Sequence, residues 1–253
     1  MSPATLAPYV CRMAGRFEGT APPPWLVLHG TLVKVDLSGF TALTERIAGR
    51  VDGGAEDISG VITALFERLI ALVHDDGGDV LQFGGDALTV WFDGEDHRGR
   101  AVGCLDRLHA AMRQHGKVSA AGRVATLRMS AGAASGELIV AALGATHREV
   151  VLVGRLVSQV LAHEAAAEPG TTVIDTDSPA GHTTVLRHRG APSRHNGPRA
   201  PEGAAVADAG AFLDSQIRLA IGADGGLAQH RTASVAFVTL RGTDAASTDA
   251  AAT

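Results

Sequence analysis

Two apolar segments of this chain each run into glycine and carry one aspartate near that junction. Residues 33–43 read VKVDLSGFTAL and contain Asp36, and residues 80–92 read VLQFGGDALTVWF and contain Asp86. Such apolar runs predict buried strands. Because a lone buried carboxylate is costly, it normally has a cation or strong hydrogen-bond donors beside it. The pair therefore indicates a shared metal site. Taken singly, Asp36 also fits a helix cap and Asp86 a hairpin turn.

The elements around these segments predict an α+β sandwich of a mixed sheet with helices. A strand over 32–37 leads into a long helical region from Gly39 to about Val73, and residues 80–92 form a hairpin with Asp86 at its bend. Downstream we expect, in order, a helix over 95–115, a strand, bend and shorter apolar element over 126–144, a strand over 147–154, a helix over 155–166 and a strand over 171–175. This β-α-β-β-α-β order resembles the ferredoxin-like family of split βαβ sheets.

Composition divides the chain into four parts. Residues 1–29 are an N-terminal lead-in, and residues 30–176 hold the α+β domain. Residues 177–208, rich in Pro, Gly, His and Arg, predict a flexible linker. Residues 209–253 begin with a short helix over 209–221 and then restart the domain: VAFVTLRGTD, within 230–245, aligns with LVKVDLSGFT and places Thr239 on Asp36. This second copy stops almost at once, so we expect a truncated repeat.

The overall composition excludes several classes of protein. A net charge of −5 argues against a nucleic-acid partner, which calls for a basic face. The two cysteines, Cys11 and Cys104, do not make a disulfide framework, and Cys104 lies in an apolar helical stretch typical of a core. The eleven histidines lack zinc-ligand spacing. With no run of about 18 apolar residues and no signal-peptide core, we expect a cytoplasmic protein with no membrane partner.

The pair VDLSGFTAL and FGGDALTVWF resembles the catalytic domain of class III adenylyl/guanylyl cyclases, above all the soluble, bicarbonate-responsive type and the paired domains of large bacterial signalling proteins. The resemblance covers about residues 30–176 and the restart at 230–245. It implies two Mg²⁺ or Mn²⁺ ions that bind a nucleoside triphosphate. The residues it implies are Asp36 and Asp86 as metal ligands, the Leu37 carbonyl as a candidate third ligand, and Ser38, Gly39, Phe40, Thr41, Gly85 and Gln82 as nucleotide-binding residues.

Four positions of the family pattern differ in this chain. Gln82 stands where the family has a purine-selecting lysine, and Val151 stands at the second base contact. Ser158 and Ala162 stand where the family has its transition-state asparagine and arginine, so no catalytic side chain is assigned. An arginine that meets developing phosphoryl charge is worth about 10³-fold or more in rate. Arg155 and His163 lie nearby in the sequence, but their helical positions favour solvated surface residues.

These features lead to two main hypotheses of function. The first is the metal-bearing half of a nucleotide cyclase that converts ATP or GTP to the cyclic 3′,5′-nucleotide and pyrophosphate. It would be weak or inactive alone and would need a second cyclase-like domain, as a homodimer or as a complementing half. The alternative is a non-catalytic module that binds nucleotide and metal, or a partner domain, for signalling. A diguanylate cyclase is disfavoured, because its signature has Glu-Phe where Ala87–Leu88 stand.

Overall fold

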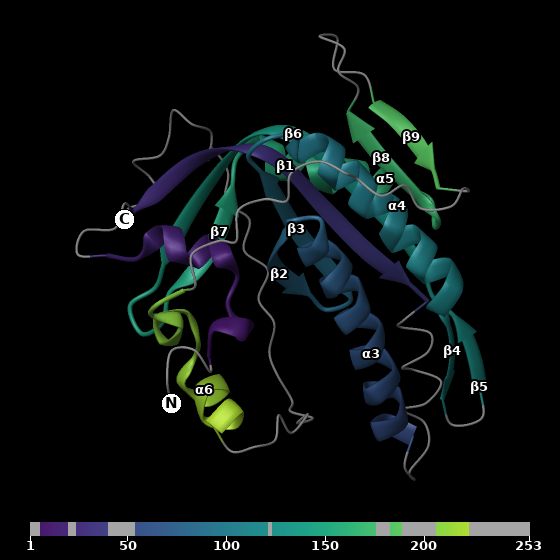
Figure 1. Cartoon of the computed structure of the whole chain (residues 1–253), viewed down its shortest axis with the longest axis horizontal. Helices are drawn as coiled ribbons and strands as arrows, with labels where there is room; N and C mark the ends of the chain where they lie inside the picture. Colours follow the sequence, from purple (N-terminus) through teal and green to yellow (C-terminus); the bar gives the residue numbers. More distant parts are fainter. Residues whose placement is uncertain are drawn as a thin grey trace. The chain divides into compact units, whose positions relative to one another are not determined.

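A computed structural model of the 253-residue chain describes residues 6–19, 24–39, 54–120, 123–175, 183–188 and 206–222 (Figure 1). The chain divides into two compact units. The larger unit holds His29–Glu137 and Ser158–Glu202, and the smaller unit holds Met1–Leu28, Leu138–Val157 and Gly203–Thr253. Each unit is described by itself below. Across the described residues, no helix combines the length and the apolar character needed to cross a membrane.

The sheet has the strand order β2-β3-β1-β6-β8-β9, with β7 paired to β6 off this path. Its strands are β1 Trp25–Ser38, β2 Asp79–Gly84, β3 Ala87–Asp93, β6 Arg128–Leu143, β7 Glu149–Val153, β8 Thr171–Asp175 and β9 Thr183–Arg187. A second, two-stranded sheet joins β4 Lys117–Ala120 to β5 Arg123–Thr126. The α-helices of the domain are α3 Gly54–Asp75, α4 His97–His115 and α5 Arg155–Ala166. The sheet is mixed, since β8 runs parallel to β6 while β3 runs antiparallel to both β1 and β2.

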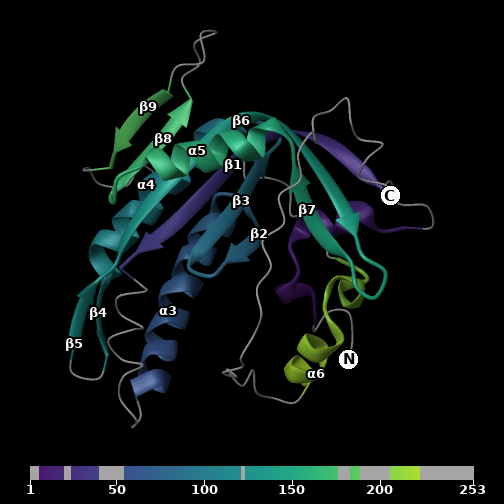
Figure 2. The same cartoon turned by 180° about the vertical axis from the view of Figure 1, so that it is seen from behind.

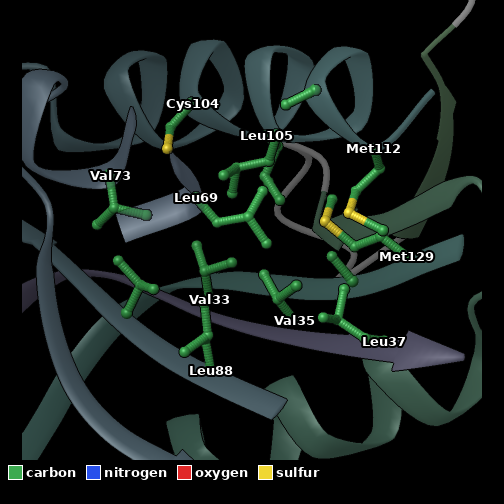
Figure 3. Close-up of a cluster of buried hydrophobic side chains, with 14 of the residues drawn as sticks. Val33, Val35, Leu37, Leu69, Val73, Leu88, Cys104, Leu105, Met112 and Met129 are labelled. Atoms are coloured by element: carbon green, nitrogen blue, oxygen red, sulfur yellow. The ribbon is translucent and has the colours of Figure 1, made fainter. Parts of the chain in front are cut away.

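The core of the larger unit lies between the sheet and the paired helices α3 and α4 (Figure 3). Along β1, Val33, Val35 and Leu37 are buried in this cluster. Successive side chains of a strand point to opposite faces, so Lys34 and Asp36 project from the other face. The helices contribute side chains at helical spacing: Leu65, Leu69 and Val73 from α3, and Ala101, Cys104, Leu105 and Leu108 from α4. Cys104 is therefore a core residue, as its sequence context predicted.

Helix α5 covers the opposite face of the sheet (Figure 2). On β6, Ala131 and Ala133 join the α3–α4 core, so Gly132 between them faces the other way. A Cβ atom on Gly132 would lie 2.3 Å from the Glu164 nitrogen and 2.5 Å from the Val160 carbonyl oxygen. Only glycine lets the backbone of α5 approach β6 this closely. Lys34, Asp36 and α5 consequently share one face of the sheet.

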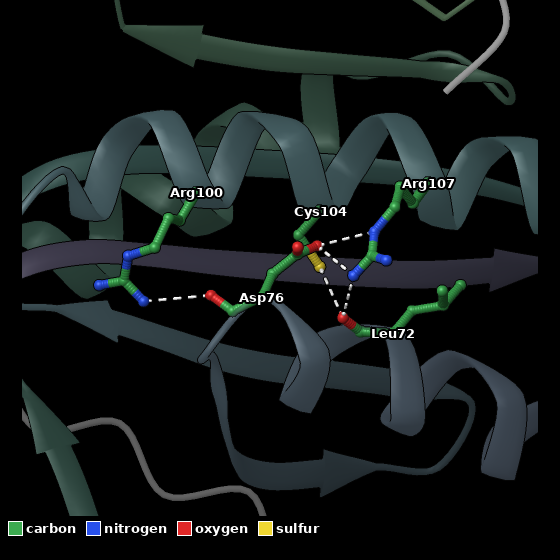
Figure 4. Close-up of polar contacts among 5 residues, drawn as sticks. All are labelled: Leu72, Asp76, Arg100, Cys104 and Arg107. Atoms are coloured by element: carbon green, nitrogen blue, oxygen red, sulfur yellow. Dashed lines mark hydrogen bonds and ion pairs between the residues drawn. The ribbon is translucent and has the colours of Figure 1, made fainter. Parts of the chain in front are cut away.

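A polar network anchors the end of α3 to α4 (Figure 4). The Arg107 Nε atom donates to the Asp76 carboxylate at 3.0 Å, and a second guanidinium nitrogen donates to the Leu72 carbonyl at 3.0 Å. Buried Arg100 donates to the Asp76 carbonyl at 3.1 Å, and the Cys104 sulfur lies 4.0 Å from the Leu72 oxygen. The Leu72 carbonyl also accepts the Asp76 backbone N–H at 3.2 Å, so the side chains of α4 add to the backbone bond that closes the helix end. They fix the turn that leads into β2, and hence the hairpin that carries Asp86.

The smaller unit contains both the N-terminal segment and the segment that follows residue 206. Its elements are η1 Ala7–Tyr9, η2 Arg12–Phe17, the β6–β7 hairpin from Leu138, η3 Ala209–Phe212 and α6 Ser215–Gly222. Leu6, Ala14, Val206, Ala209 and Leu213 form its core. Arg148 donates to the Phe17 carbonyl at 2.7 Å and lies 5.3 Å from the centroid of the Phe212 ring, so it links the two terminal segments.

Several sequence expectations need correction. Residues 128–143 form one continuous strand rather than a strand, a bend and a second element, because its small residues are packed on both faces: Gly132 against α5, and Ala131 and Ala133 in the core under α3 and α4. Strand β9 lies inside 177–208, so part of the expected linker is sheet, paired to β8. Strand β1 begins at Trp25, so the sheet starts inside the 1–29 lead-in rather than after it. The expected helical stretch 40–53 and the repeat at 230–245 lie outside the described residues.

Candidate functional site

Asp36 and Asp86 are brought to one end of adjacent strands. Asp36 is near the end of β1, and Asp86 is the second residue of the two-residue turn between β2 and β3. Gly84 pairs with Ala87 across this turn, and Gly85 has a φ of +72°, as the first central position of a type II′ turn requires. Because Val35 pairs with Leu88, the next residue of β1, Asp36, comes opposite Ala87, which directly follows Asp86. The hairpin prediction is confirmed.

The two carboxyl groups act on each other electrostatically. Burial raises the pKa of Asp36, the negative charge of Asp86 raises it further, and the nearby Lys34 ammonium lowers it. In the described part of the chain, no three His, Cys, Asp or Glu side chains are grouped to hold a metal ion by themselves. Two carboxylates nevertheless fit the way proteins hold Mg²⁺, which keeps waters and substrate phosphates as its remaining ligands. The donor set thus fits a metal that arrives with a nucleotide.

The residues that follow Asp36 are arranged by the sheet. The side chain of Leu37 is buried in the core, so only its backbone carbonyl group could contact a metal ion. The Ser38 hydroxyl donates to the Arg128 carbonyl at 3.4 Å. Gly39 has a φ of +94°, and a Cβ atom there would lie 3.1 Å from the Thr126 oxygen. Glycine at this position therefore suits both the turn and the close approach. The expected nucleotide contacts at 40–41 lie outside the described residues.

A third carboxylate, Glu164 of α5, joins this face and was not anticipated from the sequence. Burial raises the pKa of Glu164, and the charge of Asp36 adds to this; Lys34 and a hydrogen bond with Ser130 oppose it. Asp36, Glu164 and Lys34 therefore lie within electrostatic reach of one another. The sequence signal for Lys34 was its spacing of two residues from Asp36 in a strand. The signal for Glu164 was weaker: the small residues of β6 mark where a helix can approach.

Helix α5 carries the two positions that differ from the family pattern. Ser158 and Ala162, one turn apart, are both exposed, as is Arg155. His163 is not the solvated residue that the sequence suggested. Its Nδ1 atom lies 2.9 Å from the Ala133 carbonyl oxygen, and its Nε2 atom lies 3.3 Å from the Asp175 carboxylate, so it anchors α5 to the sheet.

The base-contact positions lie on strands. Gln82 is exposed on β2, in a cross-strand row with Thr89 and Lys34. Val151 is half-buried in β7, where it pairs with Ala141. Neither position supplies a charged side chain, which agrees with the departure from the family pattern noted in the sequence.

Solved structures with similar architecture define the fold. The guanylyl cyclase Cya2 has a TM-score of 0.52 and 23% sequence identity, over 60% of this chain and 77% of that chain. A bacterial light-regulated adenylyl cyclase has a TM-score of 0.51 and 17% identity, over 64% of this chain and 47% of that chain. The chain therefore has the α+β fold of adenylyl and guanylyl cyclase catalytic domains, as its two motifs predicted.

A short segment of the chain is also similar in sequence to known proteins. The chain is 42% identical over 65 residues to adenylate cyclase type 10 of Rattus norvegicus, and 40% identical over 65 residues to that of Homo sapiens. Each match covers 24% of this chain and 4% of the length of the relative. No protein-family model matches the chain. The segment that is similar is thus short, and it supports the cyclase resemblance over only part of the domain.

Proposed function

We propose that this chain is the metal-bearing half of a nucleotide cyclase. Asp36 and Asp86 hold Mg²⁺ or Mn²⁺, with the Leu37 carbonyl as a further oxygen ligand. The observation that supports the proposal is the placement of these two carboxylates at one end of β1 and the β2–β3 hairpin, in a cyclase fold, where the charge of Asp86 raises the pKa of Asp36. A cap or a turn residue alone would not need the second carboxylate beside it.

The nucleoside triphosphate would bind against the turn that follows β1. By the family resemblance, the backbone N–H groups of residues Ser38 to Thr41 would bind its phosphates, of which Ser38 and Gly39 are described, and Gly85 and Gln82 on the hairpin would complete the site. Divalent ions, when bound, would polarise the 3′-hydroxyl and offset the charge of the leaving pyrophosphate. The protein's own part is to hold the carboxylates in register and to keep the phosphates oriented.

The chain alone would turn over weakly or not at all. Exposed Ser158 and Ala162 supply neither the amide nor the guanidinium that the resemblance calls for. Loss of such an arginine costs about 10³-fold in rate, which is roughly 4 kcal/mol of barrier. A second cyclase-like domain, from a homodimer or a complementing half, would have to supply these groups.

A second candidate function is a module that binds nucleotide and metal without catalysis. The exposed face of α5 favours it, since Ser158, Leu161 and Ala162 present a hydroxyl, an apolar side chain and a methyl group there. A signalling module of this kind would keep the metal carboxylates and would never form product, even with its partner domain bound.

Thermal unfolding tests the metal site. Mn²⁺ with ATP or GTP at 100 times its Kd should stabilise the chain by about 2.7 kcal/mol, which is roughly 5–10 °C in Tm. Asp36→Asn or Asp86→Asn should remove this shift. Glu95→Gln is the matched control, because Glu95 is exposed and lies past the far end of β3, roughly 20 Å from Asp86. A full shift in both aspartate variants would refute the assignment.

Product formation separates the two candidate functions. The purified chain should release no measurable cyclic nucleotide from ATP or GTP with Mn²⁺. Addition of a domain that carries the asparagine, arginine and lysine positions should give turnover that Asp36→Asn abolishes. Binding without turnover in that mixture would favour the non-catalytic module.

A further inference from the structure

Lys34 is a cation placed among the carboxylates of the candidate site. It is two residues before Asp36 on β1 and half-buried, and it projects from the same face of the sheet. Cross-strand pairing puts Lys34 opposite Thr89 and Thr89 opposite Gln82, so it lies in a row that crosses β1, β3 and β2. A lysine in this row can reach the end of β2, next to the turn that holds Asp86.

The ammonium group does reach that far. The Lys34 Nζ atom lies 3.4 Å from the place a Cβ atom of Gly84 would occupy. Gly84 is the last residue of β2, and a Cβ atom there would make ordinary van der Waals contact with the ammonium. The ammonium therefore lies beside the end of the hairpin that carries Asp86.

The charges around this ammonium are predominantly negative. The positive charge of Lys34 lowers the pKa of both Asp36 and Glu164, and the negative charge of Asp86 raises the pKa of Asp36. Two carboxylates, Asp36 and Glu164, thus share the charge of Lys34, and the carboxylate of Asp86 acts on the first of them. A lysine ammonium is a compact point charge with three donors, suited to neutralise carboxylate or phosphate oxygens. It also repels any other cation placed close to it.

We propose that Lys34 is a built-in cation that takes the place of one of the two divalent ions expected by family resemblance. The chain then holds one divalent ion per bound nucleotide, next to Asp86 and Asp36, while the ammonium balances the remaining carboxylate charge. This inference rests on the proposed nucleotide–metal site, but the number of ions is independent of whether the chain is an active enzyme.

Counting bound ions tests the inference. The probe is an ATP analogue with a methylene group between the α and β phosphorus atoms, or its GTP counterpart, dialysed to equilibrium with Mn²⁺ and the full chain. Protein-bound Mn²⁺ is measured by electron paramagnetic resonance and bound nucleotide by absorbance. We expect one Mn²⁺ per bound nucleotide for the wild type, two for Lys34→Met, and one for the control Lys34→Arg, which keeps the charge. Lys34→Gln replaces Lys34→Met if the latter does not fold.

The possible counts separate the two proposals. Two Mn²⁺ per nucleotide in the wild type would overturn the role of Lys34 and leave the metal site intact. One in both the wild type and the neutral variants would overturn it equally, because Lys34 would then not govern the count. If the wild type binds no Mn²⁺ that depends on the nucleotide, and Asp36→Asn gives the same result, the metal site itself is refuted and this inference with it.

Discussion

A buried histidine pair makes the stability of the domain depend on pH. The His109 and His188 rings stack with centroids 4.1 Å apart, and both Nε2 atoms lie 3.0 Å from the Thr172 hydroxyl. His188 Nδ1 contacts the Asp106 carboxylate, which only accepts hydrogen bonds. The Thr172 hydroxyl has a single proton, so it can donate to only one of the two rings. Burial and the neighbouring His188 ring both disfavour the protonated form of His109.

The protonation energy of His109 sets the size of the effect. Burial, then His188 and Arg113, lowers the pKa of His109 to about 3 from 6.5. His109 therefore becomes protonated near pH 6.5 in the unfolded chain, but only near pH 3 in the folded chain. Above pH 6.5 this histidine does not change the free energy of unfolding. Below pH 6.5 the free energy of unfolding falls by about 1.4 kcal/mol per pH unit. At pH 5 the expected loss is about 2 kcal/mol.

Urea unfolding at pH 7 and pH 5 measures this loss. The variant His109→Gln keeps a donor for Thr172 but removes the titrating ring, so its stability should fall by about 2 kcal/mol less between the two pH values than that of the wild type. His115→Gln, a half-exposed residue on the same helix, is the matched control and should behave as the wild type. Equal pH dependence of the wild type and His109→Gln would refute the reasoning.

Two further predictions concern α5. Gly132→Ala should destabilise the chain by about 1–3 kcal/mol in urea unfolding, because its Cβ atom would meet the Glu164 nitrogen at 2.3 Å. Gly60→Ala, in α3 with no atom within 4 Å of the new Cβ, should instead stabilise it by up to about 1 kcal/mol, and a loss of stability there would contradict the packing. The double variant Ser158→Asn with Ala162→Arg should raise cyclic nucleotide formation by a homodimer of the chain, in which each copy supplies these groups to the metal carboxylates of the other, by up to about 10³-fold; no rise would argue against a cyclase-type use of this helix face.

Local pattern was enough to predict most of the elements. The alternation of Val33, Val35 and Leu37 places Asp36 on the opposite face of β1, and the glycines before Asp86 specify a two-residue turn. Helix α4 spans His97–His115, close to the expected 95–115, since its apolar residues follow helical spacing. The fold class follows from the order of these elements, and similar solved structures confirm it.

Long-range contacts were beyond the sequence. The expectation of a bend in 126–144 rested on its small residues, but Gly132 lies against α5 and Ala131 and Ala133 lie in the core under α3 and α4. The same polar side chain can be solvated or buried according to its partners, and His163 is buried beside the Ala133 carbonyl and the Asp175 carboxylate. Strand β9 has few apolar residues of its own and exists because β8 offers it an edge.

The sequence by itself determined two apolar strands that each lead to an aspartate, Asp36 near the end of β1 and Asp86 in the hairpin turn, and thereby a cyclase-like fold. These are properties of neighbouring residues, governed by side-chain period and glycine geometry. Only the tertiary structure decided what surrounds the carboxylates. Glu164 arrives from a helix far along the chain, and Lys34 reaches across the sheet to Gly84. Charge interactions depend on distance in space rather than along the chain, so the interaction of Lys34 with the carboxylates of Asp36 and Glu164 became visible only in the folded protein.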